Sequence, residues 1–142
     1  WFESSFEYKG ITYLTAEHWM MAEKARLFKD EEILDEILKS YGPHEAKHLG
    51  RKVNGFDVEI WKKHCFKIVC NGNYLKFQQN DELKDFLHST KSKILVEASP
   101  YDQIWGIGLK SDAKGIDDPN NWRGENLLGY ALMEVRDRLF TQ

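Results

Sequence analysis

Two charged residues, Glu17 and Lys24, lie seven positions apart in a segment that begins at Thr15 and predicts a helix. Thr15 suits an N-cap, and Glu17 falls in the first turn, where the helix dipole stabilises a carboxylate. Residues spaced by three, four and seven share one helical face, so Met20 and Met21 lie between the two charges. A helical face that served only to pack in the core would be apolar throughout. The two α-carbons would lie about 10.5 Å apart along the axis, so the long side chains can converge on one ligand. The alternative is that both extend into solvent or pair weakly with neighbours.

A second group of polar and aromatic residues follows an apolar segment that ends near residue 98. The chain turns at Ser99-Pro100 and then presents Asp102, Trp105, Gly106 and Gly108. Glycine lets the backbone approach a ligand closely, so we predict substrate contacts at both glycines. The alternative is an ordinary turn followed by an irregular buried segment.

A third group, Trp122-Arg123-Gly124-Glu125-Asn126, stands just before the last predicted helix. An arginine at a helix N-terminus, with free backbone N–H groups behind it, suits a phosphate group. We therefore predict that Trp122, Arg123 and Asn126 contact the substrate.

Residues 44–48 read His-Glu-Ala-Lys-His, the H-E-x-x-H pattern that places two zinc ligands one turn apart with a general base between them. Pro43 would put His44 in the first helical turn. A catalytic zinc needs a third protein ligand, and Arg51 and Asn54 occupy positions at which the extended motif has glycine and histidine. We therefore expect solvated histidines and no metal.

Helices, a hairpin and one long loop must position these groups. The pattern predicts a hairpin over 6–13 and helices over 15–28, 30–40, 43–49 and 57–79, then a short helix from 80 or 81. It further predicts a buried strand, or at least an extended segment, at 94–96, a loop over 99–125 and a last helix from about 126. The expected fold is mainly α: one multihelical domain over 1–142, with a small N-terminal β-hairpin and one short strand before a long Gly/Asp-rich loop. A loop of this length in a compact domain is usually functional or disordered, and its aromatic and polar residues favour function.

Composition narrows the class of protein. The 142 residues suit one domain, and a net charge of −3 argues against binding nucleic acid by bulk electrostatics. Cys65 and Cys70 would lie about 140° apart on a helix and could not pair there, which predicts a reduced, cytoplasmic protein. No apolar run approaches the roughly 20 residues of a membrane span. The chain starts at Trp1 and not at Met, so we expect the N-terminus to be incomplete.

An ordered series of short motifs runs through nearly the whole chain and resembles the NADAR (YbiA-like) superfamily of N-glycosidases and ADP-ribose-processing enzymes. The motifs are Glu17-His18, Lys24-Ala25, Glu45-Ala46-Lys47, Leu49-Gly50-Arg51, Trp61, Lys76-Phe77, Val96-Glu97-Ala98-Ser99 with Asp102, Trp105-Gly106-Ile107-Gly108, Trp122-Arg123-Gly124, Asn126 with Leu128-Gly129, and Leu132-Met133. The family's segment ahead of the hairpin is represented here only by a fragment around Trp1-Phe2.

The resemblance implies a mostly helical fold and hydrolysis of N-glycosidic bonds without a cofactor. It implies two substrate classes: the ribosylamino-pyrimidine phosphates of early riboflavin synthesis, and ADP-ribose attached to guanine. It also implies roles for individual residues. Glu17 and Lys24 would be polar active-site residues, Trp61, Asp102 and Trp105 would complete the pocket, and Asn126 would lie near the phosphates.

Cleavage of an N-glycoside builds positive charge at C1′ and the ring oxygen, and an acid must help the base to leave. We hypothesise that Glu17 and Asp102 supply these groups, and that Trp61 or Trp105 stacks on the leaving base. Lys24 could form a Schiff base at C1′, which the resemblance supports, but this needs a neutral amine. A nearby Glu17 would raise the pKa of Lys24 and burial would lower it, and the sequence leaves the outcome open.

Other functions remain as alternatives. A non-catalytic module that binds ADP-ribose or NAD would use the same Trp and Arg residues without releasing a base, and would not require both Glu17 and Lys24. A zinc hydrolase and a plain interaction domain rank below it. As partner we expect a small-molecule nucleotide or an ADP-ribosylated base, with a base flipped from single-stranded nucleic acid as a variant of the second.

Overall fold

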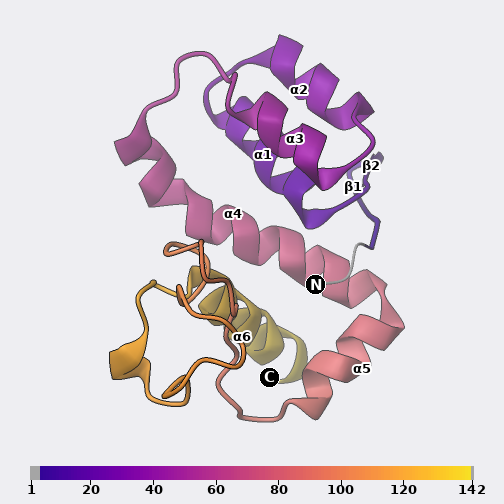
Figure 1. The fold of residues 1–142 in the computed structure, drawn as a ribbon. Helices are drawn as coiled ribbons and strands as arrows, with labels where there is room; N and C mark the ends of the chain where they lie inside the picture. Colours follow the sequence, from indigo (N-terminus) through magenta and orange to yellow (C-terminus); the bar gives the residue numbers. More distant parts are fainter. Residues whose placement is uncertain (1–3, 142) are drawn as a thin grey trace. The chain divides into compact units, whose positions relative to one another are not determined.

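The computed structural model describes residues 4–141, and the chain divides into two units, Trp1–Phe86 and Leu87–Gln142 (Figure 1). The first unit contains β1 (Phe6–Tyr8), β2 (Ile11–Tyr13), α1 (Ala16–Leu27), α2 (Glu31–Lys39), α3 (Pro43–Gly50), α4 (Val58–Gln79) and the first part of α5 (Asp81–Ser89). The second unit contains the 3-10 helix η1 (Pro119–Asn121) and α6 (Leu127–Phe140). The predicted mainly α fold with an N-terminal hairpin is confirmed, whereas the single domain stays a prediction.

The hairpin lies within the predicted range, 6–13. β1 and β2 are antiparallel, with Phe6 opposite Tyr13. Lys9 has φ +50° and Gly10 has φ +80°, so both residues of the turn adopt the left-handed conformation. Two-residue turns of this kind match the twist of paired strands.

Short polar side chains set the starts of three helices. Thr15, Asp30 and Asp57 each precede a helix and accept hydrogen bonds from backbone N–H groups two or three residues later. These caps satisfy N–H groups that have no partner within the helix. The predicted starts of α1, α2 and α4 are therefore confirmed.

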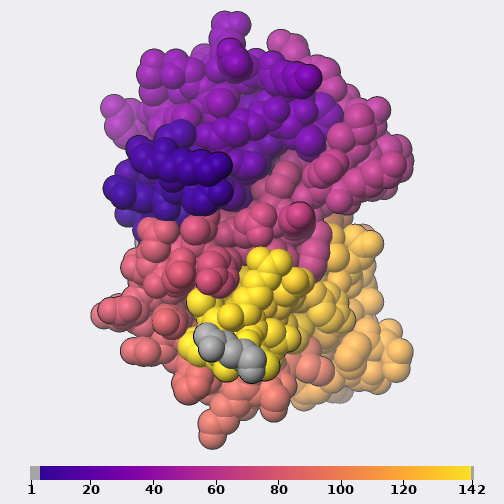
Figure 2. Space-filling view, turned by 180° about the vertical axis from the view of Figure 1, so that it is seen from behind, coloured from indigo at the N-terminus to yellow at the C-terminus, as the bar shows by residue number. Residues whose placement is uncertain are grey.

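The core of the first unit forms around α1, which packs against α2, α3 and α4 (Figure 1). Trp19 of α1 is buried, and its indole N–H donates to the carbonyl of Ile68 in α4 at 2.8 Å. A side chain at Gly72 would collide with the Trp19 ring, so glycine allows α4 to approach α1. The aromatic rings of Phe6 and Tyr13 also contact Trp19, and Figure 2 shows the hairpin as an indigo patch on the surface of this unit.

His18 joins α1 to the end of α2. It is buried, with Nδ1 2.7 Å from the Thr15 hydroxyl and Nε2 3.1 Å from the Ser40 carbonyl. Because a carbonyl only accepts hydrogen bonds, Nε2 is the donor. Both ring nitrogens are therefore used within the fold.

The second unit contains no strand in its described part, so the strand predicted at 94–96 is wrong. Ile94 is 64% exposed and Val96 39% exposed, and the segment is therefore not buried as predicted. The side-chain amide of Asn126 occupies the place of a neighbouring strand. It accepts a hydrogen bond from Glu97 N–H at 2.9 Å and donates one to the Leu95 carbonyl at 3.0 Å.

The loop between residues 99 and 125 is held by its own backbone. The Ile107 carbonyl accepts from the N–H groups of Arg123 and Gly124, at 2.8 and 2.9 Å. Trp122 anchors the far end, because its indole N–H donates to the Ile116 carbonyl at 2.8 Å. Across residues 4–141, the helices are all too short or too polar to cross a membrane.

Candidate active site

Glu17 and Lys24 occupy one face of α1, as the sequence predicted. Both side chains are half-buried, and among the described residues no ion pair joins them or involves either one. Their convergence on a ligand stays a prediction.

Lys24 lies against two aromatic rings. Its Nζ is 4.5 Å from the ring centroid of Phe56 and 5.6 Å from that of Trp61. The structure therefore brings together Lys24 and Trp61, two of the predicted site residues. An ammonium over a ring face is attracted by the negative electrostatic potential of that face.

Phe56 is a neighbour of Lys24 that was not predicted from the sequence. Its ring packs against Phe28, with centroids 5.4 Å apart. A signal was present: Phe56 directly precedes the N-cap Asp57, and Trp61 is the fourth residue of α4. Apolar residues at these two positions often pack together across a helix start, in the arrangement called a hydrophobic staple.

The environment of Lys24 lowers its pKa. Burial among apolar groups is the larger cause, and the positive charge of Arg51, just after α3, adds to it. Both effects disfavour the ammonium form. The question that the sequence left open, between a neighbouring carboxylate and burial, is therefore decided in favour of burial.

Asp102 holds the turn that carries Trp105. Its Oδ1 accepts hydrogen bonds from the N–H groups of Ile104 and Trp105, at 3.0 and 2.8 Å. Both Asp102 and Trp105 are half-buried. A carboxylate with one oxygen engaged in this way keeps the other available for chemistry, since Oδ2 makes no hydrogen bond to the described chain.

The glycines of this loop are required by close backbone packing. A β-carbon at Gly106 would lie 2.8 Å from the Asp102 carbonyl oxygen, and one at Gly108 would lie 2.9 Å from the β-carbon of Arg123. Gly108 also has φ +73°, a conformation that favours glycine. At Gly124 a β-carbon would collide with the carbonyl of Gly106. This packing explains Gly106 and Gly108 without a ligand, and their predicted substrate contacts stay predictions.

The prediction of free N–H groups at the start of α6 is wrong. Leu127 and Leu128 donate to the carbonyls of Ile104 and Trp105, both at 3.1 Å, and Asn126 donates to Gly106 at 3.0 Å. The loop has folded back over the helix end and occupied these donors. The Arg123 side chain is exposed, and its contact with a phosphate stays a prediction.

Asn126 is completely buried, and both polar atoms of its side chain bond to the backbone at 95 and 97. Trp122 is half-buried and bonded to Ile116. Both residues therefore shape the loop, and their contacts with substrate stay predictions.

The predicted residues fall into two groups. Glu17, Lys24 and Trp61 belong to the first unit, and Asp102, Trp105, Gly106, Gly108, Trp122, Arg123 and Asn126 belong to the second. Their assembly into one catalytic site stays a prediction.

The two histidines of the H-E-x-x-H pattern are exposed on α3, while Ala46 between them is buried. Within residues 4–141, no group of three or more His, Cys, Asp or Glu side chains could hold a metal ion. The pattern therefore follows from a short helix that buries its small residues and turns its polar face to solvent.

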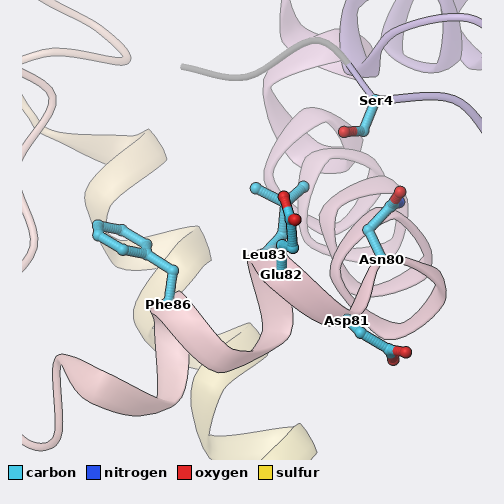
Figure 3. Close-up of a pocket in the computed structure, with 6 residues that line it drawn as sticks. All are labelled: Ser4, Asn80, Asp81, Glu82, Leu83 and Phe86. Atoms are coloured by element: carbon cyan, nitrogen blue, oxygen red, sulfur yellow. The ribbon is translucent and has the colours of Figure 1, made fainter.

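A pocket of about 420 Å³ lies where α4 passes into α5 (Figure 3). It is lined by Ser4, Asn80, Asp81, Glu82, Leu83 and Phe86. Two carboxylates in its wall would repel an anionic substrate. We therefore do not assign the reaction to it.

Comparison with known proteins gives matches over nearly the whole chain. The family model of the NADAR domain matches residues 2–140, a range that includes parts of both units. N-glycosidase R617 of Acanthamoeba polyphaga mimivirus is 44% identical over 142 residues, covering 96% of this chain and 84% of the viral protein. Protein irg-1 of Caenorhabditis elegans is 37% identical over 136 residues, and the match covers 94% of this chain and 64% of that protein.

N-glycosidase YbiA of Escherichia coli is 32% identical over 130 residues, covering 92% of this chain and 72% of YbiA. The NMR structure of YbiA matches this structure with a TM-score of 0.78 at 30% identity, over 96% of this chain and 73% of that one. The mainly α fold is therefore shared.

Proposed function

The chain belongs to the NADAR domain family and is a hydrolase of N-glycosyl bonds, and we propose that it frees the base from C1′ of an N-ribosyl compound. The observation that carries this proposal is the position of Lys24. Its amine lies over two aromatic rings, and its pKa is lowered by burial and by Arg51. A lysine in such surroundings is suited to act as a nucleophile.

In the proposed reaction the C1′–N bond breaks, its electron pair goes to the base, and an acid protonates the base. Positive charge then develops at C1′ and the ring oxygen, where a carboxylate stabilises it. We assign these two tasks to Glu17 and Asp102. Trp61 or Trp105 would stack on the departing base.

The neutral amine of Lys24 would add to C1′. A proton would then pass from the nitrogen to the ring oxygen as the C1′–O bond breaks, which gives a protonated Schiff base. Water hydrolyses this Schiff base to the free sugar and the free amine. Burial favours this route because it increases the fraction of neutral amine at a given pH.

For the substrate we propose ADP-ribosylated guanine or a ribosylamino-pyrimidine phosphate. The net charge of −3 favours a nucleotide or a single extruded base over long duplex DNA, whose binding needs many cationic contacts. The exposed Arg123 offers a cation for a phosphate group.

The test is to incubate the protein with ADP-ribosylated guanosine and, separately, with the ribosylamino-pyrimidine phosphates, and to detect the free base by mass spectrometry. We expect release from one class and loss of release in Glu17→Gln. Tight binding of ADP-ribose without release from either class would overturn the proposal in favour of a non-catalytic binding module.

A further inference from the structure

Phe56 differs from the other residues near Lys24, because it belongs to none of the motifs that predicted the site. It lies between the Asn54-Gly55 turn and the first residues of α4. Its ring centroid is nevertheless closer to the Lys24 amine than that of Trp61, at 4.5 Å against 5.6 Å. A residue without a motif thus makes the closer aromatic contact with the proposed nucleophile.

The Phe56 ring packs against Phe28, the residue that ends α1. The two ring centroids are 5.4 Å apart, and Phe28 lies four residues after Lys24. The end of α1 therefore contacts the ring that lies against the amine, so the distance from Lys24 to Phe56 does not depend on the segment before α4 alone. Phe56 remains 44% exposed, which leaves part of it open to solvent or to a ligand.

We propose that Phe56 is a positioning residue for Lys24: its ring face holds the amine in place while its bulk keeps water away. The proposal rests on the proposed function insofar as Lys24 attacks C1′. The placement of the amine by Phe56 can be tested independently of the reaction.

The two effects of the ring act in opposite directions on the amine. The ring face attracts the ammonium and favours the charged form. Exclusion of water favours the neutral form, and so does the positive charge of Arg51. Burial and the charge of Arg51 lower the pKa of Lys24, and removal of the ring isolates the contribution of its face.

This opposition makes two substitutions diagnostic. Phe56→Leu keeps an apolar side chain and removes the ring face, so the pKa of Lys24 should fall below its wild-type value. Phe56→Ala admits water, so the pKa should rise toward 10.5, the ordinary value for lysine. Phe56→Tyr keeps both the ring and the bulk and should leave the pKa near its wild-type value.

The pKa is measured by NMR titration of protein labelled with ¹³C at the lysine ε-carbon, with the Lys24 signal assigned from its loss in Lys24→Arg. Tyr41→Leu is the matched control, because Tyr41 is a 91% exposed aromatic residue in the same unit. It should leave the Lys24 signal unchanged. A Lys24 pKa that moves in the same direction in Phe56→Leu and Phe56→Ala, or in neither, would overturn the proposal.

Base release provides the second measurement. With misplacement of the amine, kcat in Phe56→Leu should fall about tenfold or more while KM changes little, and Phe56→Tyr should retain most of the rate. If the wild-type protein releases base but Phe56→Leu has an unchanged kcat, the positioning role is wrong and the hydrolase assignment stands. If no base is released at all, the proposed function fails, and the NMR titration still decides whether Phe56 positions the amine.

Discussion

The face of α1 and the loop between residues 99 and 125 hold their polar residues by different means. On α1, helical periodicity places Glu17 and Lys24, and the rings of Phe56 and Trp61 lie against the amine. In the loop, backbone hydrogen bonds between distant segments place Asp102 and Trp105. The first arrangement depends on individual side chains, and a substitution can replace one of them while the backbone keeps its position. The second depends on backbone approach, which a single added methyl group can disrupt. Substitutions of Glu17 and Lys24 should therefore affect activity more than stability, and substitutions in the loop should affect both.

The largest expected effect is on activity. Lys24→Met removes the amine and keeps a long apolar side chain, so base release should fall by about 10³-fold or more, with little change in stability. Lys9→Met is the matched control, because Lys9 also lies over a ring, that of Tyr8 at 5.3 Å, but on the exposed hairpin. Steady-state kinetics of both variants provide the test. A wild-type kcat in Lys24→Met would contradict the expectation that the polar residues of α1 act mainly on activity.

A methyl group in the loop should have the next largest effect. In Gly124→Ala the β-carbon would collide with the Gly106 carbonyl and approach the Gln103 α-carbon to 2.8 Å. Because backbone atoms cannot move aside as a side chain can, we expect a loss of about 2–3 kcal/mol in the free energy of unfolding. Urea denaturation measures it. Gly42→Ala is the control, since a β-carbon there meets nothing within 4 Å. Equal stability of the two variants would contradict the packing described for the loop.

Substitution of Asn126, whose side-chain amide links the backbone at 95 and 97, should have the third largest effect. Asn126→Ala removes the partners of the Leu95 carbonyl and the Glu97 N–H. Loss of these hydrogen bonds in a buried setting should cost about 1–3 kcal/mol. Hydrogen exchange of the Glu97 amide, followed by NMR, should accelerate in this variant. It should not change in Asn120→Ala, whose side chain is exposed.

The smallest expected effect is electrostatic. Arg51 lowers the pKa of Lys24, so Arg51→Gln should raise it. Below that pKa the fraction of neutral amine increases with pH, and kcat/KM should increase with it until the amine is neutral. The rising limb of the pH–rate profile should therefore begin to level off below pH 10.5 and move to higher pH in Arg51→Gln. Lys52→Gln, a neighbouring exposed cation, is the control. A limb that stays in place in Arg51→Gln would show that this charge does not act on Lys24.

Local rules explain why much of the first unit could be predicted from sequence. Caps at Thr15, Asp30 and Asp57 and the periodicity of apolar residues depend only on neighbours within a few positions. They fixed the helix starts and placed Glu17 and Lys24 on one face. Phe56 could be missed because it is neither charged nor part of a motif, although its position before the α4 cap fits the hydrophobic-staple pattern.

The second unit was harder to predict because its partners are distant in sequence. The strand at 94–96 was wrong because its apolar residues are exposed, and because Asn126, about thirty positions later, satisfies its backbone. The prediction of free N–H groups at the start of α6 was wrong for a related reason. The carbonyls of residues 104 and 105 accept hydrogen bonds from these N–H groups. Neither contact can be recognised from residues that are close to each other in the sequence.

The most direct test of the central claim, that Lys24 attacks C1′, is reductive trapping. Protein and substrate are mixed with borohydride, digested and analysed by peptide mass spectrometry. We predict a ribosyl adduct on the peptide that contains Lys24, and its absence in Lys24→Arg. Release of base by the wild-type protein with no adduct on Lys24 would contradict the claim and would leave the amine as a group that only binds the substrate.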